Sequence, residues 1–164
     1  MDNICIVADG LVNGSVALVI PNRRALLELA QQRFSEALST TTGDNSTNNS
    51  LFERVCLHTG VIEHVHETII ATGLEQHLKP IELPSVITLC PEEWTPESNL
   101  LTAAMKLKRV NIARRHADDI ERMFAMLRAN PKLLISGGRF KSTKKAIANA
   151  TQTIDKATSK SVNV

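Results

Sequence analysis

Two short, β-prone runs of apolar residues lie near the start of the chain, at residues 4–7 and 15–20. The stretch between them contains Asn13-Gly14, a pair that tolerates the positive φ angles of tight hairpin turns. The sequence therefore predicts two antiparallel strands joined by a turn.

A helical period follows the second run. Asn22 comes directly after Pro21 and is a favourable N-cap residue, and apolar positions recur behind it at roughly helical spacing. This spacing predicts an amphipathic helix that ends near Leu38. Its apolar positions are Ala25, Leu26, Leu29, Phe34 and Leu38.

Residues 39–50 interrupt the pattern, because they are almost all Ser, Thr, Asn, Gly or Asp. Such a segment cannot bury enough apolar area to offset the entropy that is lost on ordering. We expect a flexible polar insertion, to which we assign no chemistry.

Apolar residues at helical spacing return between residues 51 and 77. They indicate one helix or two short helices, with Gly60 and Gly73 as the expected breaks. Pro80 and Pro84 then favour extended chain, so the helical region should end before them.

Residues 86–89 form the third predicted strand. A loop rich in proline and glutamate follows, and we expect it to run over the surface as far as Arg109. Residues 111–128 again show helical spacing, which predicts a last amphipathic helix that stops near Asn130-Pro131. The predicted fold class is α+β, with a small three-stranded antiparallel sheet flanked by helices.

The 164 residues suffice for one domain with a tail and are too few for a typical two-domain enzyme. We expect a domain over residues 1–130 and a basic, weakly structured tail over residues 131–164. The net charge of +2 hides an asymmetry, because residues 1–100 sum to −8 and residues 101–164 sum to +10. Solubility is the expected role of the tail, and contact with an acidic partner or a membrane surface is the alternative.

Composition narrows the classes of partner. Aromatic residues make up only 3% of the chain, so nucleic acid, whose single strands stack on aromatic side chains, is not an expected partner. The longest apolar stretch, residues 16–20, is much shorter than the roughly 20 residues of a membrane-spanning helix. We expect the chain itself to be soluble.

The cysteines and histidines do not form a recognisable metal motif. His58, His64 and His66 lie within ten residues of each other, but their order fits neither H-E-x-x-H nor H-x-x-E-H. We interpret them as surface histidines on a helix and predict no metal ligand. The cysteines are widely spaced in apolar surroundings, so we expect reduced, buried thiols. They are Cys5, Cys56 and Cys90.

The segment with candidate chemistry is residues 99–109, in which a polar loop ends in the three cations Lys106, Lys108 and Arg109. These cations precede the last predicted helix, where the helix dipole disfavours positive charge. Phosphate binding, docking of a partner and simple solvation are alternative uses of such a cluster.

This segment resembles a known motif. Thr102-x-x-x-Lys106-Leu107-x-Arg109 is similar to the C-terminal lysine motif of adenylate-forming enzymes. Residues 99–102, Asn-Leu-Leu-Thr, resemble the form found in long-chain fatty acyl-CoA synthetases. The similarity extends over about residues 2–126 and includes the strand pair and the approach to the third strand.

The resemblance implies the C-terminal cap domain, incomplete at its N-terminus, of a ligase that joins a long-chain fatty acid to CoA using ATP. Lys106 matches the lysine that enters the active site in the first half-reaction, near the acyl carboxylate and the ATP α-phosphate. Thr102, Lys108 and Arg109 are weaker candidates for substrate or nucleotide binding. ATP and CoA are the implied substrates, and the implied magnesium ion is bound by the N-terminal domain.

The sequence also departs from the family pattern. Met105 stands where other branches usually carry glycine, which favours the long-chain acyl branch, and Ala103 replaces the usual proline. The family's Ser/Thr/Gly-rich ATP loop and T-G-D segment have no counterpart in the sequence. We therefore expect a fragment that is inactive without an N-terminal adenylation domain. The full enzyme is expected at the cytosolic face of the endoplasmic reticulum or of another organelle membrane.

Two alternatives stay open. The chain could be a free-standing, non-catalytic binding module whose basic tail docks an acidic partner or a membrane surface. It could also be the cap domain of another adenylating enzyme, since the acceptor pocket that would distinguish the branches lies outside the matching segment.

Overall fold

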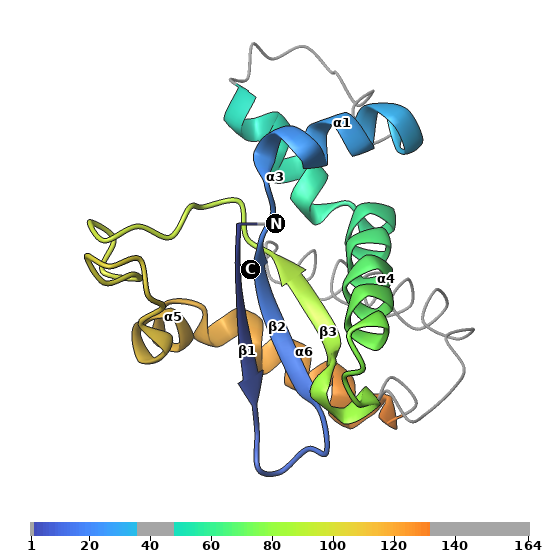
Figure 1. Ribbon diagram of the computed structural model, residues 1–164, viewed down its shortest axis with the longest axis vertical. Coiled ribbons are helices and arrows are strands. Elements are labelled where there is room, and N and C mark those ends of the chain that lie inside the picture. The colour runs from blue at the N-terminus through green and yellow to red at the C-terminus, as the bar shows by residue number, and fades with distance from the viewer. Residues whose placement is uncertain (1, 36–47, 132–164) are drawn as a thin grey trace, which may run out of the picture.

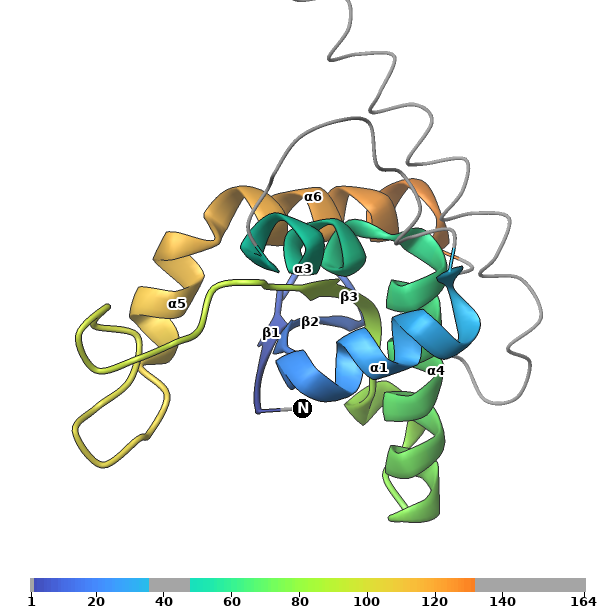
Figure 2. The ribbon, with the colours of Figure 1, turned by 90° about the horizontal axis from the view of Figure 1, so that it is seen from above.

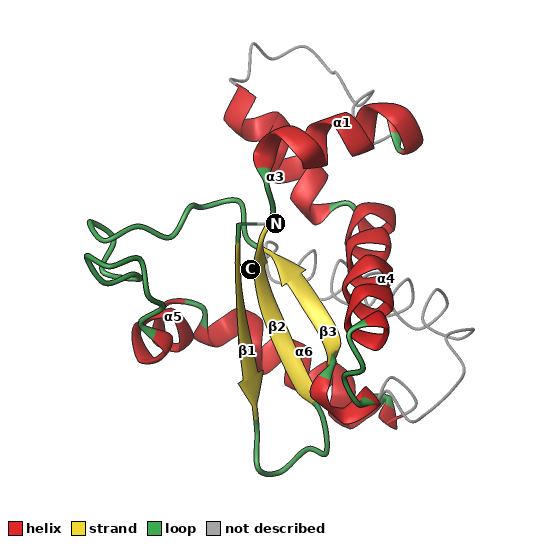
Figure 3. Ribbon diagram, viewed as in Figure 1, coloured by secondary structure: helices red, strands yellow, loops and turns green. Residues whose placement is uncertain are grey.

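A small sheet lies at the centre of the fold, between two layers of helices (Figures 1 and 3). The computed structural model describes residues 2–35 and 48–131. Its strands are β1 (Asn3–Ala8), β2 (Ser15–Ile20) and β3 (Pro84–Leu89), in the order β1-β2-β3. The helices are α1 (Arg23–Arg33), α3 (Asn48–Leu57), α4 (Thr59–Glu75), α5 (Arg109–Arg115) and α6 (Ala117–Ala129), with a 3-10 turn η1 at Pro80–Glu82. The predicted α+β class, with a three-stranded sheet flanked by helices, is confirmed.

β1 and β2 form the predicted antiparallel hairpin. Ala8 pairs with Ser15 at its closed end. In the connecting turn, the carboxylate of Asp9 accepts a hydrogen bond from the backbone N–H of Leu11 at 3.0 Å. The hairpin therefore has both the strand register and the turn stabilisation that a short polar connection requires.

β3 runs parallel to β2, which corrects the prediction of a wholly antiparallel sheet. Val16 is in register with Val86, and Val19 with Leu89. The helices α1, α3 and α4 lie between these two strands in the sequence and return the chain to the end of the sheet where β2 begins. A parallel pair needs such a long crossover, whereas an antiparallel pair can close with a short turn.

α1 begins where the sequence predicts and ends earlier. Asn22 is its N-cap, because the side-chain Oδ1 accepts a hydrogen bond from the N–H of Ala25 at 3.1 Å. The helix ends at Arg33. Its predicted end, Leu38, lies outside the described residues.

The polar stretch predicted as a loop lies only partly within the described residues. Residues 39–47 lie outside them, and residues 48–50 form the first turn of α3. The loop prediction is wrong for these three residues. The buried side chains of Phe52 and Val55 stabilise α3 against the sheet, and the helix extends back into the polar stretch.

α3 and α4 are separated at His58, whose backbone is extended, and not at either predicted glycine. Both glycines lie inside α4 at points of close packing. A β-carbon on Gly73 would lie 2.3 Å from Cδ2 of Leu83, and one on Gly60 would lie 2.9 Å from Cε1 of Phe34. The glycines therefore permit close approach of a neighbour and do not break the helix.

The helix predicted over residues 111–128 is two helices that meet at His116. The bend is visible in Figure 2, where α5 turns away from the line of α6. It allows α5 to contact β1 while α6 packs along β2 and β3.

β2 is buried on both faces and separates two apolar cores. Successive side chains of a strand point to opposite faces, so Val16, Leu18 and Ile20 enter one core while Ala17 and Val19 enter the other. The first core lies under α5 and α6, and the second lies under α1, α3 and α4. The cysteines are buried and free, as predicted: Cys5, Cys56 and Cys90.

Two further predictions concern the membrane and the tail. No helix among the described residues is both long and apolar enough to cross a bilayer. Residues 132–164 of the predicted basic tail lie outside the described residues, so the domain boundary near residue 130 stays a prediction.

Candidate functional site

The loop between β3 and α5 carries three of the four predicted site residues, and the fourth, Arg109, begins α5. The loop leaves the sheet on the side of α5 (Figure 1). The prediction of a surface loop is wrong for Trp94, Leu100 and Leu101, because their side chains are buried in the core under α6. These side chains hold the base of the loop against the domain.

Residues 101–107 form a tight turn, which we name the lysine turn. Leu101 and Leu107 pair as an isolated antiparallel bridge at its base. The N–H of Thr102 donates to the carbonyl of Lys106 at 2.8 Å, and the N–H of Lys106 donates to Oγ1 of Thr102 at 3.1 Å. Thr102 therefore closes the turn and fixes the backbone of Lys106.

Met105 occupies the left-handed backbone region, with φ of 58°. This region favours glycine, because a β-carbon crowds the neighbouring carbonyl. The Met105 side chain is 64% exposed, so apolar burial contributes little to hold it there. The turn geometry therefore favours glycine at position 105, where this chain has methionine.

The Lys106 side chain is exposed at this turn. Within residues 2–35 and 48–131 it forms no hydrogen bond or ion pair, although its backbone is fixed by Thr102. A lysine ammonium is a compact charge on a long flexible stem. Lys106 is therefore a cation with a fixed base and a side chain that is available to an anion.

Lys108 and Arg109 are engaged within the domain. Nζ of Lys108 donates to Oδ1 of Asn99, and the backbone N–H of Lys108 donates to the carbonyl of Leu100 at 2.9 Å. Nη1 of Arg109 donates to the carbonyl of Ile6 in β1 at 3.2 Å. The two cations thus tie the end of the loop to its own base and to the sheet.

Asn99 lies at the start of the predicted segment, but its structural role was not predicted from the sequence. Its φ of 61° lies in the left-handed region, which asparagine tolerates better than most residues. Besides accepting from Lys108, it accepts a hydrogen bond at its carbonyl from Nδ2 of Asn111 at 2.9 Å. An asparagine that ends a run of turn-forming residues was the available signal.

Further positive charge lies on α5 beside Asn99. A hollow of about 260 Å³ is lined by Asn99, Asn111, Arg114, Arg115 and their neighbours Ser98 and Leu100. Arg115 forms an exposed ion pair with Glu92 at 3.0 Å. This hollow beside Asn99 is therefore cationic, and Glu92 partly neutralises it.

The histidines of α4 do not all lie on the surface. His66 is buried, and its Nε2 donates to the carbonyl of Pro84 at 2.7 Å, which corrects the prediction of a surface histidine. Burial lowers its pKa. His58 and His64 are half-buried. The described residues contain no group of three or more His, Cys, Asp or Glu side chains arranged to hold a metal ion.

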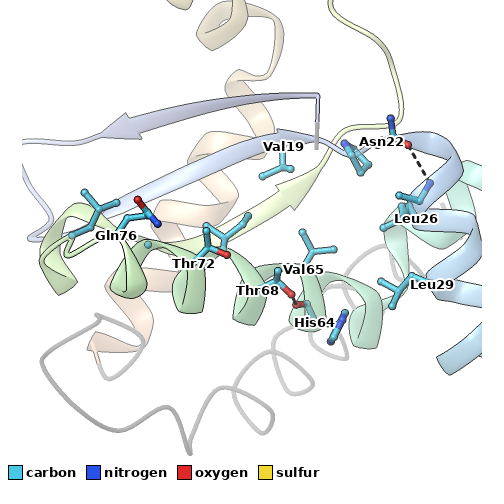
Figure 4. Close-up of a pocket in the computed structure, with 14 residues that line it drawn as sticks. Val19, Asn22, Leu26, Leu29, His64, Val65, Thr68, Thr72 and Gln76 are labelled. Atoms are coloured by element: carbon cyan, nitrogen blue, oxygen red, sulfur yellow. Dashed lines mark hydrogen bonds between the residues drawn. The ribbon is translucent and has the colours of Figure 1, made fainter.

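An apolar groove of about 500 Å³ lies on the other face of the sheet, between α1 and α4 (Figure 4). Val19, Leu26, Leu29 and Val65 form part of its apolar lining. The polar side chains along it include His64, Thr68 and Thr72 of α4 and Gln76, directly after the helix. The groove shares no lining residue with the lysine turn, so the two are separate features of the surface.

Comparison with known sequences identifies long-chain acyl-CoA synthetases among the relatives of this chain. The chain is 33% identical over 125 residues to long chain acyl-CoA synthetase 8 of Arabidopsis thaliana, and the matched segment covers 76% of this chain and 16% of that protein. It is 32% identical over 125 residues to long-chain-fatty-acid–CoA ligase 1 of Schizosaccharomyces pombe, covering 76% of this chain and 17% of that protein. No protein-family model matches the sequence. The chain thus spans about one sixth of the length of these relatives.

Comparison with solved structures supports the fold. The adenylation domain of a carboxylate reductase from Mycobacterium chelonae matches with a TM-score of 0.55 and 16% identity, covering 74% of this chain and 15% of that one. A carboxylic acid reductase didomain from Segniliparus rugosus, in complex with AMP, matches with a TM-score of 0.57 and 17% identity, covering 83% and 16% of the two chains. The chain is therefore a homologue of part of the long-chain acyl-CoA synthetases, with the fold of an adenylate-forming enzyme domain.

Proposed function

We propose that the chain is the C-terminal cap domain of an ATP-dependent long-chain fatty acid:CoA ligase. The observation that carries the proposal is the position of Lys106, which is exposed on a turn whose backbone is fixed by Thr102. The homology to long-chain acyl-CoA synthetases agrees with it. In such an enzyme the chain would act only together with an N-terminal adenylation domain.

The proposed role of Lys106 follows from electrostatics. Attack of a fatty acid carboxylate on the α-phosphate of ATP brings two anions together. A cation that bridges them in the transition state lowers the barrier selectively, and its location on a separate domain would let it withdraw before CoA attacks the acyl-adenylate. Lys106 suits this role because the described part of the domain does not engage its ammonium group.

Thr102, Lys108 and Arg109 are proposed to support Lys106. The hydrogen bonds of Thr102 within the lysine turn favour a positioning role. The contacts of Lys108 with Asn99 and of Arg109 with Ile6 favour the same role. Direct contact of these three residues with substrate or nucleotide stays a prediction.

ATP, CoA and a fatty acid would be the substrates of the whole ligase. Binding of its magnesium ion by the N-terminal domain is part of the same proposal and follows from the family resemblance alone. Association of the whole enzyme with an organelle membrane is part of the same proposal, and it would depend on segments beyond the residues described.

The first experiment is to sequence the native transcript upstream of the codon for Met1. A reading frame that continues into a Ser/Thr/Gly-rich ATP loop and a T-G-D segment would support the ligase. An in-frame stop just upstream would contradict it and favour the free-standing binding module. Salt-sensitive binding of the chain to anionic vesicles, lost on removal of residues 139–164, would then be the expected behaviour.

The second experiment tests Lys106 in the whole ligase. Lys106→Ala should slow acyl-adenylate formation on the order of 10²- to 10³-fold, the usual effect of removing a group that stabilises transition-state charge. Transfer of a preformed acyl-adenylate to CoA should change much less, and single-turnover kinetics separates the two steps.

Lys79→Ala is the matched control, because Lys79 is also an exposed lysine and lies at η1, away from the lysine turn. It should leave both steps unchanged. Equal loss of both half-reactions in Lys106→Ala would contradict a role confined to adenylation.

A further inference from the structure

His116 lies at the junction of α5 and α6 and joins them to the loop that carries the lysine turn. Its side chain is only 11% exposed. One ring nitrogen, Nε2, lies 3.4 Å from Nε1 of Trp94, and the other, Nδ1, lies 3.4 Å from Oδ2 of Asp119. We name these three residues the Trp94–His116–Asp119 triad.

The hydrogen-bond chemistry of the triad determines where the proton of His116 lies. The indole N–H of Trp94 can only donate, so Nε2 of His116 must accept and cannot carry a proton. The remaining ring proton lies on Nδ1 and is donated to the Asp119 carboxylate. The triad therefore requires a neutral imidazole with its proton on Nδ1.

A second proton on His116 would break one of these contacts. In the imidazolium form both ring nitrogens are donors, so Nε2–H would face the N–H of Trp94. The Asp119 contact would persist and strengthen, because it would become an ion pair. Protonation therefore acts selectively on the bond to Trp94.

The bond to Trp94 is connected to the lysine turn through consecutive contacts. The carbonyl of Thr95, next to Trp94, accepts hydrogen bonds from the N–H groups of Leu100 at 3.3 Å and Leu101 at 3.2 Å. Leu101 forms the base of the lysine turn by pairing with Leu107. From the other side, α5 runs from Arg109, two residues after Leu107, to Arg115, directly before His116.

Other charged and titratable groups surround the triad. Asp119 is also paired with Arg122 of α6. Arg115, the last residue of α5, is paired with Glu92 of the loop. The buried thiol of Cys90, at the end of β3, is close enough to Asp119 to be influenced by its charge. Each of the two arginines is thus paired with a carboxylate. Among the described residues, Asp119 is the carboxylate that contacts His116, and Trp94 is the partner of Nε2.

We propose that His116 is a positioning residue for the lysine turn. Neutral His116 holds the loop through Trp94, and protonated His116 releases Trp94. Its effect on the loop is independent of the chemistry of the whole enzyme. Its effect on catalysis rests on the proposed role of Lys106.

The first test uses intrinsic fluorescence of the full 164-residue chain. Trp94 is the only tryptophan and the chain has no tyrosine, so the emission reports on the surroundings of Trp94. Between about pH 8 and about pH 5, where histidine changes charge, we expect the emission of Trp94 to change in a single titration. His116→Gln should abolish the titration, since the glutamine amide oxygen can accept from Trp94 and does not ionise.

His64→Gln is the matched control, because His64 is a half-buried histidine of α4 on the other face of the sheet. This variant should keep the titration. A flat emission in the unsubstituted chain, or a titration that survives in His116→Gln, would overturn the proposal. Neither result depends on whether the chain belongs to a ligase.

The second test measures the loop itself by amide hydrogen exchange. At about pH 5.5 the N–H groups of Leu100, Leu101 and Lys106 should exchange several-fold faster in the unsubstituted chain than in His116→Gln, and at about pH 8 they should exchange alike. Comparison of variants at one pH removes the intrinsic pH dependence of exchange. Equal protection at both pH values would contradict a link between His116 and the lysine turn.

In the whole ligase, the acid side of the pH profile of acyl-adenylate formation should shift in His116→Gln. If the emission of Trp94 titrates but the pH profile does not shift, the positioning role of His116 stands and the proposed role of Lys106 is contradicted. A shift in CoA transfer alone would overturn the link to adenylation.

Discussion

Met105 holds a backbone conformation that costs an ordinary side chain about 1–2 kcal/mol relative to glycine. The closing hydrogen bonds of Thr102 and the bridge between Leu101 and Leu107 keep the lysine turn in this geometry. Residues in such conformations persist only where their surroundings enforce them. The contacts that close the turn beside Lys106 thus enforce the conformation of Met105.

Met105→Gly should therefore be more stable than Met105→Ala, by up to about 1 kcal/mol, because glycine removes the crowding and loses somewhat more chain entropy. The measurement is the free energy of unfolding from urea denaturation of both variants. Ala104→Gly is the control, since Ala104 does not have a positive φ and should be destabilised by glycine. A Met105→Gly variant that is less stable than Met105→Ala would mean that the turn is not strained.

At the scale of elements, α4 and β3 are joined by a buried polar contact as well as by apolar packing. His66 of α4 donates from Nε2 to the carbonyl of Pro84, the first residue of β3. Desolvation lowers the pKa of His66, and the hydrogen bond to Pro84 and the charge of Glu67 oppose this only in part. The folded protein therefore favours neutral His66.

This contact predicts a dependence of stability on pH. An unfolded histidine has a pKa of about 6.5, so as the pH falls below that value the unfolded chain binds a proton that the folded chain resists. Stability should be lost on acidification below about pH 6.5, until the lowered pKa of the folded state is reached. Above about pH 6.5 His66 is neutral in both states and contributes no slope.

The measurement is the urea midpoint at about pH 7.5 and about pH 5.5 for the unsubstituted chain and for His66→Gln. The substitution should reduce the difference between the two midpoints, although it should also lower both, because the buried hydrogen bond is altered. An unchanged difference would show that other groups cause the acid sensitivity.

At the scale of the whole molecule, β2 contributes side chains to two cores that lie on opposite faces of one small sheet. The loop with the lysine turn belongs to the core under α6, through Trp94, Leu100 and Leu101. The apolar groove belongs to the opposite face. The site is therefore positioned by one core only, while the other core holds the crossover that carries the chain from β2 to β3.

The reactivity of the three cysteines tests both cores, because Cys5 and Cys90 lie in one core and Cys56 lies in the other. Burial raises the pKa of Cys56 and of Cys90 to about 12, and it raises the pKa of Cys5 against the opposing effect of Arg109. Since the thiolate is the reactive form, a thiol reagent at about pH 8 should label none of the three in the folded chain and all three in urea. Rapid labelling of one cysteine under native conditions would show that its core opens locally.

Local sequence was sufficient for the elements that depend on near neighbours. The β1–β2 hairpin, the N-cap of α1 at Asn22 and the third strand were predicted because turn residues, caps and short apolar runs act within a few positions. The site residues around Lys106 were proposed from the linear motif, and their role in the site stays a prediction. Their proposed chemistry follows from resemblance, since spacing alone left phosphate binding, docking and solvation as alternatives.

Tertiary structure alone decided the features that depend on distant residues. The parallel direction of β3, the close packing of Gly60 and Gly73, the burial of His66 and the bend at His116 all arise where segments far apart in the sequence meet. The same is true of the three cations, because only folding brings Arg109 to β1 and Lys108 to Asn99 while it leaves Lys106 exposed. A period or a motif carries no information about the partner that a side chain will meet, because that partner is set by the packing of the whole chain.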